Sequence, residues 1–383
     1  MWRQMASIDF PFVSKPLVCW SETSTQQGFV LSNFPVLSVN DDPASFFAKY
    51  DTVYLQPGAT YVWKNIPVNS NLHLHGQGAT VKLIGNGPIL FVQPEETLPV
   101  NEITVYIEKI HFVGDDVVFR HQPMSTADEG SGAIWFHRVL KTTVADCIFE
   151  NFKGAALLYS DLAEYWRGHK WKQQHSITGC KFDRCRIGIT NTGGSEFALA
   201  TSNHFIDCQI CLNAIGGNWM YNNNITIKCR CAYLHIKDNM WYSNYETDNA
   251  DGGKGTISNN VFCYSDLESL WPSTFKLHNG DEIALSAIYF DDDDFVPPTM
   301  LGNFHLYSSI NLVNIPSDQL HKYSITGCSF YGNTSIEQDG NEGQIIVGEN
   351  FKDSIFLIGC SGNDLTLRNV LEENVIPKFG TFK

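Results

Sequence analysis

The sequence predicts an all-β solenoid, a right-handed parallel β-helix, and three observations lead to this. First, one short phrase recurs along the chain. Second, the phrase carries a marker residue, Asn or Cys, directly preceded by Gly, Asn, Asp or Ser. Third, the residue three places before the marker is always apolar. The copies are VADCIF (144–149), ITGCKF (177–182), ATSNHF (200–205), YNNNIT (221–226), IKDNMW (236–241), ISNNVF (257–262), MLGNFH (300–305), ITGCSF (325–330) and LIGCSG (357–362).

Each copy describes a strand, a one-residue corner and a second strand with an inward aromatic side chain. The residue before the marker is of a type that enters the left-handed region at low cost. Repeats spaced by roughly 20–25 residues are typical of solenoids, whose coils stack at about 4.8 Å. A β-sandwich also places strands between such turns, but it does not need the same corner chemistry at the same phase. The pattern therefore favours the β-helix.

Composition limits the function classes. The 383 residues carry a formal net charge of −15, and 43% are hydrophobic. Nucleic acid and anionic membranes require a basic face, so we expect neither as a partner. The first twenty residues hold no continuous apolar stretch, and we therefore expect no secretory leader. Without secretion, the eleven cysteines are expected to be reduced thiols.

The pattern divides the chain into three parts. Residues 1–45 lack the phrase and contain four prolines, which indicates an extended arm with a short helix near 43–49. Residues 46–375 form the β-helix, with excursions at about 157–174 and 264–299. Residues 376–383 are a C-terminal tail.

Several of the repeated residues are expected to stack in columns. Asn203, Asn224, Asn239 and Asn260 would bond amide to amide along one corner. Cys185, Cys208 and Cys229 each follow a marker by five residues, and Cys211 and Cys231 lie nearby. A column spaces thiols along a line, whereas zinc needs four converging ligands. We interpret the cysteines as buried filler.

Parallel β-helices of the pectin-lyase-like class often host polysaccharide lyases and hydrolases, and this is one alternative function. Their chemistry needs paired carboxylates, or a bound cation with a basic residue. Simple alternation predicts nine outward residues on three successive coils, and none is acidic. They are Arg186, Gly188, Thr190, Gln209, Cys211, Asn213, Arg230, Ala232 and Leu234. Asp266 and Glu268 belong to a single coil, so the prediction is no enzyme.

Two further groups of residues are candidates for metal sites. The run from Asp291 to Asp294 lacks the alternation and turn glycine of a calcium loop, which favours a solvated acidic loop. His73 and His75 project to one side of a strand, but no third ligand is evident in the sequence. The sequence therefore predicts no catalytic residue, no cofactor and no metal.

Two features suggest surfaces for partners. The small residues Gly188, Cys211 and Ala232 would form an outward row that lets another subunit approach closely, or else a solvated strand face. Arg186 and Arg230 could bind an acidic partner, although isolated surface arginines are common.

The stretch GCKFDRCRIGI (179–189), followed by SNHFIDC and NNITIKC, resembles the adenoviral family of the early-region large T antigen. Within that family the sequence is most similar to the hexon-interlacing branch found in atadenoviruses. The resemblance covers about residues 140–265 well, and the remainder through the coil pattern.

This resemblance implies a homotrimeric minor capsid protein on the virion exterior. It would bridge hexons and other capsid proteins, and would pass through the host nucleus during assembly. The first alternative is an intracellular adaptor like the large T antigen, whose long amino-terminal region has no counterpart before the coils here. The second is a carbohydrate-active enzyme or a tailspike-like glycan binder.

Overall fold

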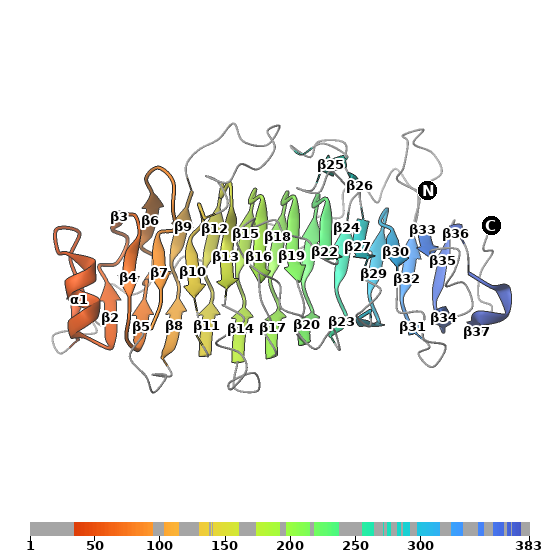
Figure 1. Cartoon of the computed structure of the whole chain (residues 1–383), viewed down its shortest axis with the longest axis horizontal. Coiled ribbons are helices and arrows are strands. Elements are labelled where there is room, and N and C mark those ends of the chain that lie inside the picture. Colours follow the sequence, from red (N-terminus) through yellow and green to blue (C-terminus); the bar gives the residue numbers. More distant parts are fainter. Residues whose placement is uncertain are drawn as a thin grey trace, which may run out of the picture.

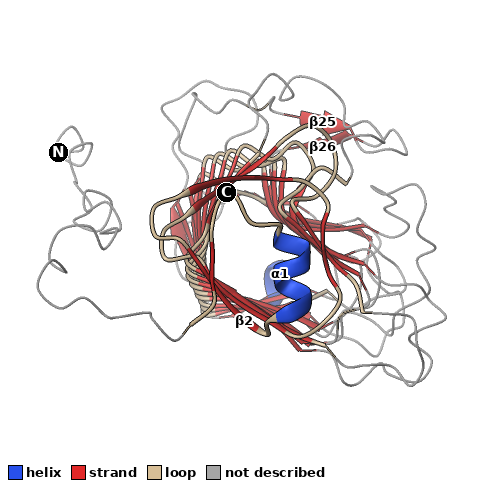
Figure 2. Ribbon diagram, turned by 90° about the vertical axis from the view of Figure 1, so that its left-hand side faces the viewer, coloured by secondary structure: helices blue, strands red, loops and turns tan. Residues whose placement is uncertain are grey.

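The computed structural model shows a long stack of β-strand coils with one helix at its first, N-terminal end (Figure 1). Viewed along the stack, three sheets surround a common interior (Figure 2). The described residues are 34–94, 103–114, 130–137, 139, 141–160, 174–191, 197–214, 218–236, 255–263, 271, 274–276, 282–284, 286–291, 297–314, 323–331, 344–347, 355–363, 366–368 and 370–376.

The three long sheets are parallel throughout, and each strand except those at the two ends pairs with strands of the coils before and after it. This confirms the predicted parallel β-helix. Sheet A contains β1 (Val36–Leu37), β2 (Thr52–Leu55), β5 (Leu72–His75), β8 (Thr104–Glu108), β11 (Lys141–Ala145), β14 (Gln174–Thr178), β17 (Phe197–Thr201), β20 (Asn218–Asn222), β23 (Thr256–Ser258), β28 (Thr299–Leu301), β31 (Tyr323–Thr326), β34 (Ile355–Ile358) and β37 (Val375–Ile376).

Sheets B and C complete each coil. Sheet B contains β3 (Thr60–Trp63), β6 (Thr80–Leu83), β9 (His111–Val113), β12 (Ile148–Glu150), β15 (Lys181–Asp183), β18 (His204–Ile206), β21 (Ile225–Ile227), β24 (Val261–Cys263), β29 (Phe304–Leu306), β32 (Ser329–Tyr331) and β35 (Ser361–Asn363). Sheet C contains β4 (Ile66–Val68), β7 (Leu90–Val92), β10 (Ile134–His137), β13 (Ala155–Ser160), β16 (Ile187–Asn191), β19 (Ile210–Ala214), β22 (Cys231–Ile236), β27 (Ser286–Asp291), β30 (Ile310–Asn314), β33 (Gln344–Val347) and β36 (Thr366–Arg368).

The first end of the stack is covered by α1 (Pro43–Lys49), the short helix that the sequence predicts. Asp42 caps it by accepting a hydrogen bond from the Ser45 N–H, and Pro43 occupies the first turn, where a missing N–H is harmless. Phe47 is buried and meets Trp63 edge-on, with ring centroids 5.9 Å apart. The coil stack itself begins at β1, ahead of the expected start at residue 46.

The predicted excursions lie partly inside the stack. Leu157 to Ser160 belong to β13, so the chain leaves sheet C only after Ser160. Within the second excursion, β27 pairs with β22 and β30. Its apolar residues directly precede the acidic run, and the sequence pattern did not distinguish them as a strand. A small antiparallel hairpin, β25 (Thr274–Lys276) with β26 (Glu282–Ala284), precedes it. At the last coil, the 3-10 helix η5 (Glu372–Asn374) leads into β37.

The left-handed corners lie where the sequence predicts them. A positive φ lets the chain turn sharply from sheet A into sheet B, and only certain residues accept it cheaply. The residues with positive φ before a marker are Asp146, Gly179, Ser202, Asn223, Asn259, Gly302, Gly327 and Gly359, with φ between 52° and 66°. At Gly302 a Cβ would also approach Asn259 Oδ1 to 2.7 Å. Asp238 lies outside the described residues.

The asparagine column forms, but with different members from those expected. Asn203 Nδ2 donates to Asn224 Oδ1 over 3.1 Å, and Asn224 Nδ2 donates to Asn260 Oδ1 over 3.2 Å. Asn260 Nδ2 then donates to Asn303 Oδ1 over 3.0 Å. Asn224 meets Asn260 directly, so no coil lies between these two, and Asn239 itself lies outside the described residues. Fifteen residues are too few for three strands and their turns.

A second column fills the interior behind sheet B. Phe112, Phe149, Phe182 and Phe205 stack with ring centroids 4.7 to 5.3 Å apart. Phe149, Phe182 and Phe205 are the inward aromatic residues of the recurrent phrase, so that prediction is confirmed. Further along, His305 takes the same position between Phe262 and Phe330, at 4.9 and 4.5 Å.

In sheet C the side chains do not simply alternate between the interior and the outer face. The predicted outward row of Gly188, Cys211 and Ala232 is therefore wrong. Cys211 and Ala232 belong to the central core, and a Cβ on Gly188 would lie 2.8 Å from the Phe205 ring. Ile189 also faces the core, so Gly188 and Ile189 point inward in succession. The outer face instead carries a separate buried apolar cluster. Its members are Ala155, Leu158, Ile187, Ile210, Cys231, Leu234 and Ile236.

The amide column predicts a specific cost for Asn224→Ala. The substitution removes the acceptor of the Asn203 N–H and the donor to the Ala200 carbonyl, both of which are buried. Leaving buried polar groups without partners costs about 1–3 kcal/mol. The temperature of thermal unfolding should therefore be clearly lower for this variant than for the wild type. Asn222→Ala is the control, because Asn222 is half-buried and bonds Ser258 and Thr256 near the surface. Equal shifts for the two variants would contradict the role of the column.

The buried histidines predict loss of stability in acid. Burial lowers the pKa of His305 from 6.5 to about 3, and that of His175 likewise. Below pH 6.5 the unfolded chain takes up these protons while the folded chain does not, so acid favours unfolding. Each residue contributes up to about 1.4 kcal/mol per pH unit.

His305→Phe should reduce this pH dependence, because a phenyl ring does not titrate. The variant should still fold, because a third phenyl ring suits the column between Phe262 and Phe330. The measurement is the unfolding free energy at several values between pH 7 and pH 4. A slope unchanged by the substitution would refute the assignment.

Candidate functional site

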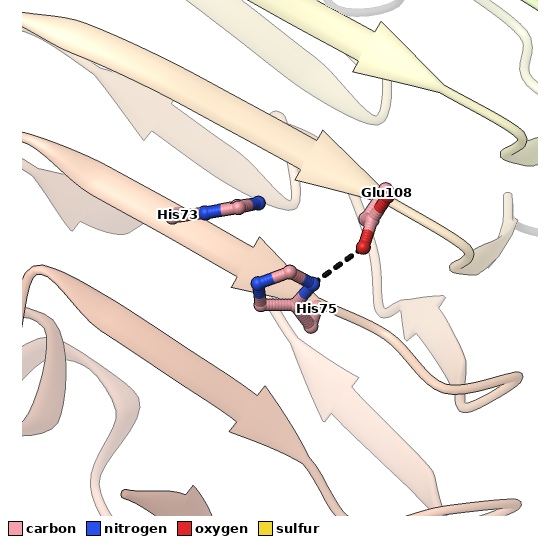
Figure 3. A group of neighbouring side chains, drawn as sticks. All are labelled: His73, His75 and Glu108. Carbon is pink, nitrogen blue, oxygen red and sulfur yellow. Dashed lines mark hydrogen bonds and ion pairs between the residues drawn. The ribbon is translucent and has the colours of Figure 1, made fainter. Parts of the chain in front are cut away.

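One cluster of metal-ligating side chains appears among the described residues, and it lies on the outer face of sheet A near the first end. His73, His75 and Glu108 each offer a ligand atom, and these atoms all lie within 4.8 Å of one another (Figure 3). The two histidines come from β5 and the glutamate from β8, the neighbouring strand. The sequence identified the histidine pair but not the third residue.

Sheet register brings the three residues together. His73 and His75 are two places apart on one strand, so both project from the same face. His75 pairs across the sheet with Glu108. The His75 Nδ1 to Glu108 Oε1 distance is 2.5 Å, and the two imidazole centroids are 3.8 Å apart. The cluster is partly exposed, with 16% and 14% of the His75 and Glu108 side chains accessible.

Two tyrosines hold these side chains in place. The Tyr106 hydroxyl donates to Glu108 Oε2 over 3.1 Å, and its ring meets His73 edge-on at 4.2 Å. Tyr54 stacks flat on His75, with centroids 4.3 Å apart and planes 7° apart. The rings therefore restrict how far either imidazole can rotate.

The electrostatics of the cluster keep His73 neutral and Glu108 ionised. Burial and the nearby His75 lower the pKa of His73, against the attraction of Glu108. Burial alone would raise the pKa of Glu108, but the hydrogen bonds from His75 and Tyr106 prevail and lower it. Lys109 Nζ lies 3.8 Å from Glu108 Oε2 and favours the charged carboxylate as well. The cluster thus presents a carboxylate beside an imidazole lone pair.

The described cysteines form no second group of potential metal ligands. Cys185, Cys208 and Cys229 are fully buried and stack as predicted, with the Cys208 N–H 3.4 Å from Cys229 Sγ. Burial raises the pKa of all three thiols. Cys211 is inside the core and Cys231 lies in the cluster outside sheet C. None of the ten described cysteines forms a disulfide, and nine of them are buried, which agrees with their interpretation as filler.

The predicted arginine pair is not a surface pair. Arg186 is 1% exposed. The Arg230 guanidinium donates to the Trp271 carbonyl, with Nε at 3.1 Å, and Trp271 Nε1 donates in turn to the Asp207 carbonyl over 2.6 Å. Arg230 thereby attaches a distant segment to the coils. Asp266, Glu268 and the run from Asp292 to Asp294 lie outside the described residues.

Two acidic residues, Glu150 and Asp183, pair across adjacent strands of sheet B. Arg184 bonds both of them, at 3.0 Å to Asp183, while Lys181 reaches Asp183 at 2.7 Å. His111 lies 3.0 Å from Glu150. Burial opposes the charge of Arg184, but the two carboxylates raise its pKa. This network of ion pairs differs from a glycosidase pair, in which one carboxylic acid must be free to donate a proton.

Comparison with protein families gives one decisive match. The family described as "Adenovirus EB1 55K protein / large t-antigen" matches residues 33–252. This range is more than half of the 383-residue chain. The chain belongs to this adenoviral family. The match includes the His73–His75–Glu108 cluster and the coils up to β22. A search of curated proteins finds no match.

Solved structures similar to this adenoviral chain are β-helical proteins of low sequence identity. The catalytic domain of GH87 alpha-1,3-glucanase, in complex with tetrasaccharides, shares 10% identity at a TM-score of 0.48, over 94% of this chain and 69% of that one. Bacteriophage CBA120 tailspike protein 3 shares 9% at 0.42, over 92% and 60%. The Geobacillus virus E2 ORF18 protein shares 16% at 0.35, over 82% and 50%. The adenoviral chain thus spans about half of the last protein's length, and these similarities carry no functional argument. No described helix is long and apolar enough to cross a bilayer.

Proposed function

We propose that this adenoviral chain is a structural minor capsid protein of the hexon-interlacing type, related to the LH protein of atadenoviruses. It acts as a homotrimer on the virion exterior, binds hexon and other capsid proteins, and carries out no catalysis. Family membership supports a viral protein, and the residue phrases of coils 179–229 support this branch of the family. The trimer draws its support from one feature of the surface.

That feature is an apolar column on the outer face of sheet A, which we call the sheet A column. Leu301, Ile358 and Ile376 are 47%, 40% and 51% exposed. They lie in line, because Leu301 pairs with Thr326, Thr326 with Ile358, and Ile358 with Ile376. Isolated exposed apolar residues are common on protein surfaces, but an aligned group indicates a contact surface.

The sheet A column continues around the corner onto sheet B. Phe304 and Tyr331 are each 37% exposed, and their rings are 5.3 Å apart. Only the corner residues Gly302 and Asn303 separate Leu301 from Phe304. A flat β-helix face with such a strip suits side-by-side packing of identical chains in closed symmetry.

A second candidate is the regulatory adaptor from which the family takes its name. The match over residues 33–252 favours it as much as it favours the capsid protein. The two differ in abundance on the particle, because a cement protein is present at high copy number and an adaptor is not.

The apolar column makes a prediction for Ile358→Asp. A carboxylate buried between subunits without a partner is costly, so this variant should be monomeric. Light scattering of the purified wild-type chain should give three times its 43.0-kDa mass. Val62→Asp is the matched control, since Val62 is 58% exposed but lies on β3, away from the column. A monomeric wild type, or a trimeric Ile358→Asp variant, would contradict the proposal.

Purified virus particles provide the test between the two candidates. Quantitative mass spectrometry should find this chain at a high, fixed ratio to hexon after salt and protease washing of the particle surface. Its absence from particles, with the chain present in infected cells, would support the adaptor instead. A non-structural protein of the same infection serves as the measure of carry-over.

A further inference from the structure

We propose that His73, His75 and Glu108 form a binding site for a divalent first-row transition metal ion, with Zn²⁺ as the ion whose preferences they match. Nothing in the proposed capsid function requires this site. Two imidazoles and one carboxylate are the donor set of zinc sites that keep a fourth position open. The same set with open positions also suits Fe²⁺.

The strongest observation for a ligand is the unsatisfied nitrogen of His73. Its Nε2 atom is buried and has no hydrogen-bond partner in the described structure. A buried polar atom without a partner normally costs stability, and such exceptions require an explanation. One ring nitrogen of His73 lies within 4.8 Å of the ligand atoms of His75 and Glu108, and a cation bound at Nε2 would satisfy that buried atom.

The surrounding residues have the character of an outer coordination shell. Metal-binding carboxylates and imidazoles are usually held by further contacts that fix their orientation. Tyr106 does this for Glu108 by its hydroxyl, and Tyr54 does it for His75 by ring stacking. Lys109 is the opposing feature, since its ammonium lies 3.8 Å from Glu108 Oε2. Lys109 is 54% exposed and can turn into solvent.

Binding requires a small rearrangement of the pair at 2.5 Å. Two ligand atoms on one tetrahedral zinc ion, with bonds of about 2.0 Å, are separated by about 3.3 Å. The proton between His75 Nδ1 and Glu108 Oε1 must leave that position, either for the other ring nitrogen or for solvent. The ion would then connect β5 to β8 and stabilise the first coils.

Calorimetric titration of the metal-free full-length chain with Zn²⁺ tests the proposal. We expect one site per chain with micromolar or tighter affinity, and a rise in the unfolding temperature. His73→Gln and Glu108→Gln should each weaken binding at least about 10-fold. Glu108→Gln keeps an acceptor for Tyr106, so it separates loss of metal from loss of fold.

The matched control is His111→Gln. His111 also faces a glutamate on the next coil, Glu150, but these two form no three-ligand group with any other described residue. Its affinity for Zn²⁺ should equal that of the wild type. Substituted Co²⁺ should show no thiolate charge-transfer band, because the ligands are nitrogen and oxygen. The proposal fails if the wild type binds no Zn²⁺, if His111→Gln weakens binding as much as His73→Gln, or if the cobalt spectrum shows thiolate ligation.

Discussion

Each coil is held by backbone hydrogen bonds to the coil before it and the coil after it, and the whole structure depends on keeping these in register. Register survives only if the chain turns at the same phase every time. The positive-φ corner fixes that phase, and the residue after it, Asn or Cys, faces the interior. The Asn203–Asn224–Asn260–Asn303 column then satisfies backbone groups that the corner would otherwise leave buried and unpaired.

The same register explains where sites can arise. Parallel stacking turns distant positions into neighbours, so His75 meets Glu108 across 33 residues of chain. It also aligns Leu301, Thr326, Ile358 and Ile376 on four successive coils. The interior is filled by stacked phenyl rings and thiols whose pKa is raised by burial, which leaves it unsuited to chemistry. We therefore expect any partner of this chain to bind its outer faces.

The sequence predicts the corners from the conformational preferences of single residues, and it predicts the inward aromatic residues from their hydrophobicity and their place in the strand. Prediction from the sequence fails where the position of a residue depends on how the coils stack. Asn239 carries the phrase, but a step of fifteen residues cannot complete a coil. Gly188 and Ile189 face inward together, so strict alternation assigns Gly188, Cys211 and Ala232 to the wrong face. Glu108 joins the histidines through a cross-strand pairing that no local pattern reveals.

We propose that this β-helix packs against copies of itself through the apolar face of its later coils. An electron cryo-microscopy map of the purified chain tests this most directly. We expect three parallel β-helices around a common axis, with Leu301, Ile358 and Ile376 buried between them. Single particles of one chain, or an assembly that leaves these three side chains in solvent, would contradict it.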